Sequence, residues 1–188
     1  MSELPPPDET LLRRLHALAC TPFTLAAFRE RWREFGWSPD PPADSNPYGF
    51  RVSLPEGWAL IVDPLGPEVI GVMLAFHYWE DRDDAQRKAA FHTAFDRAGA
   101  LALRLFPEPF LRWTDADEQA HRALAWEGTH GILILQEASF DPQFGLEVDF
   151  WLAGCARAEF RPETPLIDWL TRRSGRLHDE RGFPSLPE

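Results

Sequence analysis

The amino-acid sequence predicts an α+β fold, in which a twisted antiparallel sheet of about five to six strands has helices packed on one face. Two observations lead to this class. The spacing of apolar residues alternates along the chain between the 3.6-residue period of a helix and the two-residue period of a strand. The strand-like runs also occur in groups separated by single helices, in the order α-α-β-β-β-α-β-β(-β)-α, which is typical of antiparallel sheets.

Two helices are predicted near the start of the sequence. Residues 8–20 place apolar side chains on one helical face, and acidic residues stand at the positive end of the helix dipole. The apolar residues of this face are Leu11, Leu12, Leu15, Leu18 and Ala19. The second helix is expected to begin at an N-cap Thr21, with Pro22 in its first turn, and to end at Gly36. Its buried face is predicted to hold Leu25, Phe28, Trp32 and Phe35.

The next segments have the period of strands. Residues 38–47 contain four prolines and are predicted to be a linker without regular structure. Residues 48–54 alternate apolar and polar side chains, and a turn leads into a second strand over 58–63. Residues 68–79 are apolar on both faces, so we expect this third strand to be central in the sheet.

A long helix is predicted next, opened by the acidic residues 80–84 and stopped by Pro107 and Pro109. Its buried stripe is expected to contain Phe91, Phe95, Ala98, Ala102 and Leu105. A short irregular stretch follows. Further strands are predicted over 121–126, 131–137 and 146–152, and a last helix over 164–173. All 188 residues are expected to form a single domain, with 1–7 and 176–188 flexible.

The composition limits the classes of function. A hydrophobic content of 44% and a charged content of 26% are typical of a soluble globular protein. A formal net charge of −11 argues against a general binder of nucleic acid or of anionic membranes, because both need a basic surface. The sequence has no apolar run long enough to span a membrane and no secretory signal, so we expect a cytoplasmic protein. Cys20 and Cys155 are expected to be reduced packing residues.

The negative charge is concentrated in the strand-bearing segments. Residues 37–80 and 107–160 together carry −12, and the remaining segments sum to +1. Tryptophans alternate with these acidic residues, and eight Trp are more than one side of a sheet can hide. The sequence therefore predicts an acidic and aromatic open sheet face that binds a basic partner. The predicted partner-binding residues are Trp79, Asp81, Trp113, Asp115, Asp117, Glu118, Trp126, Glu127, Glu137, Glu147, Asp149 and Trp151.

Motifs of catalysis are missing from the sequence. It contains no G-x-S-x-G, G-x-G-x-x-G, phosphate-binding loop, H-E-x-x-H or paired C-x-x-C. A metal site from His77, Asp81 and His130 is chemically conceivable, but no spacing in the sequence enforces it. We therefore expect a protein without catalytic activity, cofactor or metal.

Several segments carry a resemblance to known families. They are Phe35-Gly36-Trp37, the strand pair around Gly57-Trp58, the strand Val69–Phe76, the helix end Leu105–Pro109 and Trp126-Glu127-Gly128 before Ile132–Leu135. Over residues 20–152 the chain resembles small bacterial immunity proteins that neutralise polymorphic secreted toxins, with a fold similar to YbjN-like proteins and type III secretion chaperones. The resemblance implies a non-catalytic protein that binds a cognate toxin and blocks its active site.

Two other classes of function remain open at this point. A secretion or folding chaperone would use the same fold to hold an extended segment of an effector, as a homodimer. A small metal- or His-dependent enzyme would need a pocket with perturbed titratable groups, for which the surroundings of His77 are the candidate. The immunity interpretation requires a partner toxin with a basic surface, and it is compatible with a monomeric or a homodimeric protein. We expect this protein to make no direct contact with nucleic acid or membrane.

Overall fold

The structure is a computed structural model that describes residues 5–40, 49–55, 57–79, 85–114, 122–138 and 146–160. In these ranges it contains three α-helices, which are α1 (Glu9–Ala19), α2 (Leu25–Phe35) and α3 (Ala85–Leu105). The strands are β1 (Ser38–Pro39), β2 (Phe50–Ser53), β3 (Ala59–Leu65), β4 (Glu68–Trp79), β5 (Leu111–Thr114), β6 (Arg122–Glu127), β7 (Ile132–Ala138) and β8 (Leu146–Ala153). A 3₁₀ turn, η1 (Arg157–Glu159), follows β8.

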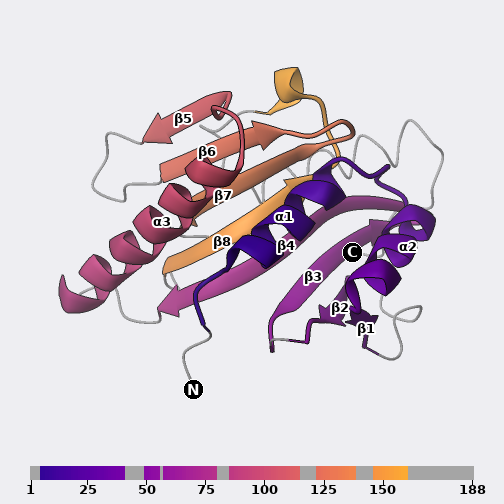
Figure 1. The fold of residues 1–188 in the computed structure, drawn as a ribbon, viewed down its shortest axis with the longest axis horizontal. Helices are drawn as coiled ribbons and strands as arrows, with labels where there is room; N and C mark the ends of the chain where they lie inside the picture. The colour runs from indigo at the N-terminus through magenta and orange to yellow at the C-terminus, as the bar shows by residue number, and fades with distance from the viewer. Residues whose placement is uncertain are drawn as a thin grey trace, which may run out of the picture.

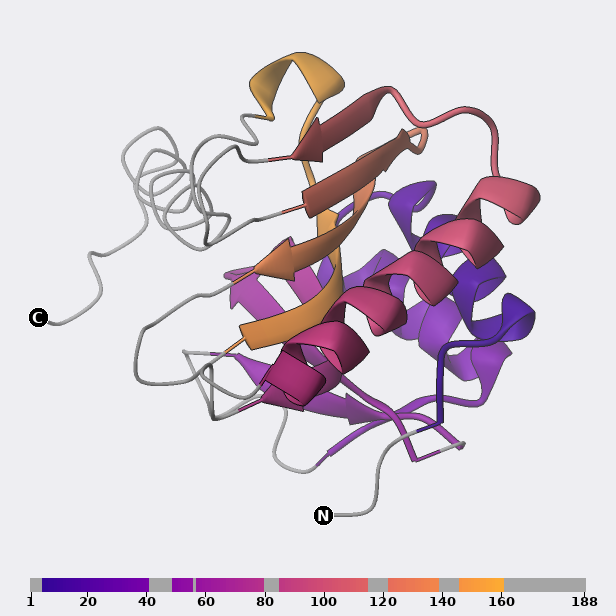
Figure 2. The ribbon, with the colours of Figure 1, turned by 90° about the vertical axis from the view of Figure 1, so that its left-hand side faces the viewer.

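All eight strands form one open antiparallel sheet, in the order β1-β2-β3-β4-β8-β7-β6-β5. The three helices lie on the same face of this sheet (Figures 1 and 2). The predicted class is therefore confirmed, but the sheet has eight strands and not five to six. The prediction that residues 68–79 form a central strand is also confirmed, because β4 pairs with β3 on one side and β8 on the other.

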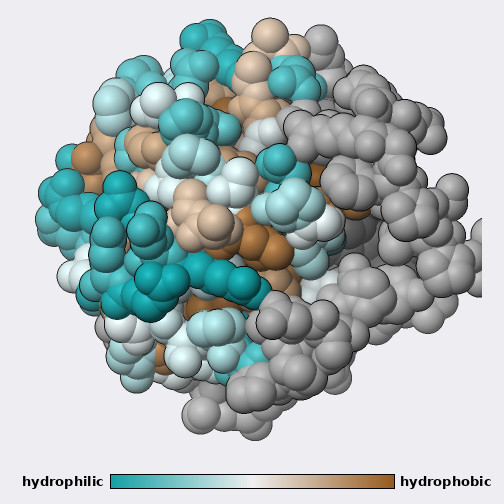
Figure 3. All heavy atoms as spheres, turned by 90° about the vertical axis from the view of Figure 1, so that its right-hand side faces the viewer, coloured by the Kyte–Doolittle hydropathy of each residue, from teal (hydrophilic) through white to brown (hydrophobic). Residues whose placement is uncertain are grey.

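The sheet is packed on both faces. The larger core lies between the sheet and the helices and contains the predicted stripes of α1 and α3. A second cluster lies on the other face and includes Ile70, Ile134, Trp151, Cys155 and Phe160. Ile61, at 44% exposure, is the exposed large hydrophobic side chain of the described residues. Figure 3 shows one side of the molecule, where hydrophobic residues are interspersed among hydrophilic ones.

The first helix forms as predicted, and the second begins later than predicted. In α1, the Asp8 side chain accepts a hydrogen bond from the Leu11 N–H. In α2 the N-cap is Thr24, whose hydroxyl accepts from the Ala27 N–H, and the predicted cap Thr21 instead donates to the Ala17 carbonyl of α1. The helix ends, as predicted, at Gly36, which has the left-handed φ of 73°.

The two edge strands were missed by the sequence analysis. Ser38 and Pro39, predicted to lack regular structure, pair with Ser53 and Val52 of β2. Proline is tolerated there because an edge strand needs hydrogen bonds on one side only. Residues 111–114, predicted to be irregular, form β5 at the opposite edge. The strands predicted over 58–63, 121–126, 131–137 and 146–152 are present as β3, β6, β7 and β8, with ends shifted by one or two residues.

Some predictions fall on residues outside the described ranges. They concern the helix over 164–173, the opening of the long helix by 80–84, most of the linker over 38–47, and the termini over 1–4 and 176–188. Among the helices that the structure describes, none combines the length and the apolar character needed to cross a bilayer.

Candidate functional site

One end of the sheet carries the predicted partner-binding residues Trp79, Trp113, Glu137 and Glu147 on its strands, and we call it the acidic end. Here β4 and β5 finish, with their arrowheads at the left of Figure 1, and β6 and β8 begin. The strand ends form a row across the sheet, because Trp79 pairs with Leu146, Ala138 with Glu147, and Arg122 with both Glu137 and Thr114. Strands that are distant in sequence thus meet at a single border of the molecule.

The name of this end comes from the sequence attached to it. Residues 80–84 follow β4, residues 115–121 join β5 to β6, and residues 139–145 join β7 to β8. These three segments contain eight acidic residues and one arginine, so they carry a net charge of −7. Asp81, Asp115, Asp117 and Glu118 belong to them and lie outside the described residues. Most of the net charge of the chain therefore belongs to segments that join the sheet at this one end.

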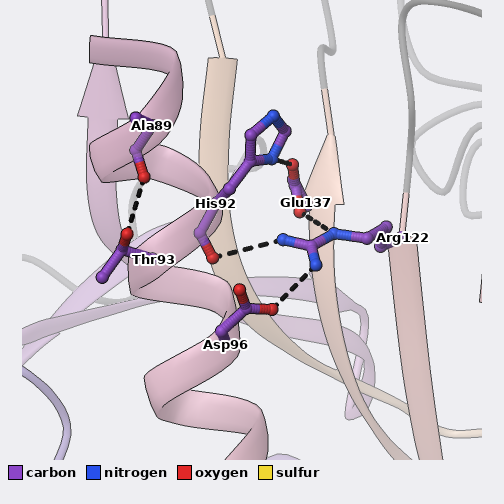
Figure 4. Close-up of polar contacts among 6 residues, drawn as sticks. All are labelled: Ala89, His92, Thr93, Asp96, Arg122 and Glu137. Atoms are coloured by element: carbon purple, nitrogen blue, oxygen red, sulfur yellow. Dashed lines mark hydrogen bonds and ion pairs between the residues drawn. The ribbon is translucent and has the colours of Figure 1, made fainter. Parts of the chain in front are cut away.

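The described part of the acidic end contains a buried carboxylate. The side chain of Glu137 on β7 is fully buried and faces α3. One of its oxygens contacts Nδ1 of His92, and the other accepts from Nε of Arg122 (Figure 4). Arg122 also pairs with Asp96 at 2.7 Å, and its guanidinium lies 4.3 Å from the ring centroid of Phe95. This network fastens the beginning of β6 and the end of β7 to α3.

The exposure of the network decreases from its outer to its inner members. The side chain of Asp96 is 63% exposed, that of His92 is 48% exposed and that of Arg122 is 24% exposed, whereas Glu137 has no exposure. Burial raises the pKa of Glu137 above its ordinary value, although the hydrogen bond and charge of Arg122, and then His92, act in the opposite direction. The loss of hydration thus outweighs the opposing contacts with Arg122 and His92, and ionising Glu137 opposes folding.

We expect Glu137→Gln to change how the stability of the protein depends on pH. Because the folded protein holds the Glu137 proton more tightly than the unfolded chain, this group stabilises the fold at low pH, and the contribution is lost as pH rises from 4.5 through the raised pKa. The variant lacks this titration. Urea unfolding between pH 4 and pH 7 should therefore show the wild type losing stability relative to the variant as pH rises.

A difference between the two proteins that stays constant with pH, or changes in the opposite direction, would contradict this expectation. Asp63 is a useful internal reference, because burial also raises its pKa and it is present in both proteins. Its titration affects both unfolding curves alike and cancels in the comparison.

Among the residues that the structure describes, the predicted open face that exposes tryptophan and acid is not found. Trp126 is 2% exposed, and its indole N–H donates to the Pro107 carbonyl at 3.1 Å in the helix-side core. Asp149 is fully buried and Trp151 is 7% exposed. Both do face away from the helix-side core, as the alternation along 146–152 predicted, but that face is also packed. Trp32, Trp37 and Trp58, each at most 3% exposed, belong with Trp126 to the helix-side core, so this one side of the sheet buries four of the eight tryptophans.

The remaining predicted residues are divided between the two ends of the sheet. Trp79 and Glu147 belong to strands at the acidic end, and their side chains lie outside the described set. Trp113 is half-buried on β5, one residue before that strand ends. Glu127 is exposed at the far end of β6. The sequence analysis missed Arg122, His92 and Asp96, for which no local pattern gives a signal.

The imidazole of His92 makes a polar contact with one described side chain, that of Glu137. The Glu137 carboxylate orients the imidazole of His92, and the second ring nitrogen points away from it (Figure 4). Within the described ranges no Ser, Thr or Cys side chain is hydrogen-bonded to His92, and no group of three or more His, Cys, Asp or Glu could hold a metal ion. Cys20 and Cys155 are free thiols, as predicted.

The fold and this site together define the class of the protein. It is an α+β protein with an open antiparallel sheet, helices on one face and an acidic end where five strands begin or end beside the network of the buried Glu137 with Arg122 and His92. Comparison with known proteins adds no relative: no family model, no curated protein and no solved structure matches the chain.

Proposed function

We propose that this protein is a non-catalytic binding module whose acidic end covers a basic surface of another protein. The observation that carries the proposal is the net charge of −7 in three segments that join the sheet at one end. Like charges gathered at one border accelerate encounter with an oppositely charged partner, and they select against acidic ones. The ion-paired Glu137 fastens the described strands of this end to α3, so that the border is carried by a rigid support.

The partner we propose is a secreted toxin with a basic active-site cleft, which makes this chain its immunity protein. Toxins that process nucleic acid need cationic clefts to hold phosphates, and a row of carboxylates can occupy those phosphate positions. The resemblance over residues 20–152 supports the same reading. The contact surface is the acidic end and not the sheet face, because Trp126, Asp149 and Trp151 are internal.

The test starts with the product of the neighbouring open reading frame, expressed in a bacterial host with and without this protein. We expect the neighbour alone to arrest growth, and this chain to restore growth through a complex that co-purifies. Reversing charge with Asp115→Lys and Asp117→Lys should weaken that complex at least tenfold and make its affinity less sensitive to salt.

The matched control reverses the same number of charges elsewhere. Glu30→Lys and Glu34→Lys change two exposed residues of α2 and should leave affinity within about twofold. If both double variants lose the same affinity for the toxin, the loss is due to the overall charge of the protein, and the acidic end is excluded as the contact surface. If the product of the neighbouring open reading frame is harmless, and this protein elutes from gel filtration as a dimer with a bound effector, the chaperone interpretation replaces the immunity interpretation.

A further inference from the structure

A cavity of about 500 Å³ lies on the second face of the sheet, which bears none of the described helices. Its lining comes from the beginning of β5, the end of β6 and the turn η1, which Figure 2 shows close together. The lining residues are Phe110, Leu111, Glu127, Ala156, Arg157, Ala158 and Phe160. Cavities that take small molecules usually measure about 300–1,000 Å³, so this one is large enough for such a ligand.

The cavity has apolar walls and two charged side chains of opposite sign. Phe110, Leu111 and Phe160 belong to the second hydrophobic cluster or pack against it. The side chains of Glu127 and Arg157 are exposed. Neither of them forms an ion pair with another residue in the described part of the chain. Both charges are therefore available to a ligand that enters the cavity.

The side chain and the backbone of Arg157 are both held in position. Its guanidinium carbon lies 5.0 Å from the ring centroid of Phe110. Its carbonyl accepts a hydrogen bond from the Phe160 N–H, and the Ala156 N–H donates to the carboxylate of Glu159 at 3.1 Å within the same turn. A guanidinium over an aromatic ring keeps the N–H groups at its edge for a carboxylate. Arg157 thus presents an oriented donor to the cavity.

The carboxylate of Glu127 is supplied by a strand of the sheet. Glu127 is the last residue of β6 and pairs with Ile132 of β7. Along β6, Ala125 belongs to the second cluster and Trp126 to the helix-side core, so alternation places Glu127 on the face of the cavity. Its oxygens can accept hydrogen bonds from an ammonium group.

The two charges together select the class of ligand. A simple carboxylate that pairs with Arg157 would be repelled by Glu127, and a simple amine that pairs with Glu127 would be repelled by Arg157. A molecule that carries an ammonium and a carboxylate on one carbon avoids both repulsions. If the same carbon also bears a large apolar group, that group can contact the walls. An apolar α-amino acid combines these three features.

We propose that this cavity binds a free α-amino acid with a large apolar side chain, such as leucine or phenylalanine. The carboxylate of the ligand pairs with Arg157, its ammonium group pairs with Glu127, and its side chain lies against Phe110, Leu111 and Phe160. This site does not depend on the toxin assignment. It lies where β5 begins and β6 ends, whereas the acidic end is where β5 ends and β6 begins.

The first test titrates L-leucine and L-phenylalanine into the full, ¹⁵N-labelled chain. We expect a saturable shift of the amide signals of Phe110, Leu111, Glu127 and residues 156–160, with one ligand bound per chain. N-acetyl-leucine lacks the ammonium group, leucinamide lacks the carboxylate and glycine lacks the side chain. Each of these three should bind at least tenfold more weakly than L-leucine.

Two single variants test the two charged contacts separately. Arg157→Gln should weaken the binding of L-leucine at least tenfold and, because a repulsion is removed, strengthen that of leucinamide. Glu127→Gln should weaken the binding of L-leucine to a similar extent and strengthen that of N-acetyl-leucine. The matched controls Arg104→Gln and Glu34→Gln change exposed residues of α3 and α2 and should leave the affinity for L-leucine within about twofold.

Several results would overturn the proposal. They are the absence of a saturable shift with both amino acids, equal binding of L-leucine and any of the three analogues, and an unchanged affinity for L-leucine in Arg157→Gln or Glu127→Gln. Shifts that spread over the whole chain without saturating would show weak contact with the surface and also overturn it. None of these results bears on the toxin complex, which is tested without an added amino acid.

Discussion

Replacing Arg122 by Met should destabilise the protein by about 3–5 kcal/mol, the usual range for breaking a buried ion pair from one side. The substitution removes the donor to one oxygen of the fully buried Glu137 and leaves that carboxylate with His92 alone. Methionine keeps an unbranched side chain over the ring of Phe95, so the loss of packing is small. Urea unfolding at pH 7 gives the free energy directly.

A second variant separates the ion pair from the rest of the site. The double substitution Arg122→Met and Glu137→Leu removes both charges and should recover most of the lost stability, because apolar packing commonly matches a buried ion pair. Arg112→Met is the matched control, since Arg112 pairs with Glu108 at the surface and such pairs contribute about 0–1 kcal/mol. A double variant as unstable as Arg122→Met would show that Glu137 is not held chiefly by Arg122.

Adding a methyl group at Gly128 should cost about 1–3 kcal/mol or more, as expected for overpacking against atoms that cannot move aside. A Cβ at this position would stand 2.5 Å from both the carbonyl carbon and oxygen of Ala19. That backbone is the end of α1, and the Ala19 carbonyl also accepts a hydrogen bond from the His130 N–H. Gly128→Ala therefore pushes α1 away from the turn between β6 and β7.

The control glycine is Gly36, where an added Cβ meets no atom within 4 Å. Its φ of 73° leaves only the strain of the left-handed conformation, about 1–2 kcal/mol. Thermal unfolding of Gly128→Ala and Gly36→Ala compares a steric clash with backbone strain. A smaller loss in Gly128→Ala than in Gly36→Ala would mean that the end of α1 is not tightly packed on the turn.

The sequence predicts the helix stripes and the inner strands well, because their periodicity reflects burial directly. Its errors occur where a contact from another element decides the outcome. The sequence analysis placed the N-cap of the second helix at Thr21, whereas the structure has it at Thr24, where residues 23–25 are hydrogen-bonded to β4 and to the turn before it. The Phe23 carbonyl accepts from the Val69 N–H, and the Leu25 N–H donates to the Pro67 carbonyl. β5 has four residues, too few for a period to be visible.

The candidate site was predicted in part. Alternation along β8 correctly separated Asp149 and Trp151 from Val148 and Phe150, but alternation gives the face of a residue and not what lies over it. The Glu137 network could not be predicted from the sequence, for a different reason. Its members Arg122 and His92 are 15 and 45 residues away along the chain, and only the pairing of β6 with β7 and the docking of α3 bring them together.

The position of β8 has a consequence for how the chain is made. It is the last strand of the described chain and yet lies in the middle of the sheet, between β4 and β7. During synthesis, β1–β4 and β5–β7 emerge as two meanders that have no edge in common. Gly71 of β4 can pair with Ala153 of β8 only after 82 more residues have been synthesised. Pairings between residues so far apart in sequence form slowly. Until then the nascent polypeptide exposes two apolar strand edges, a state open to capture by chaperones or to aggregation on the ribosome.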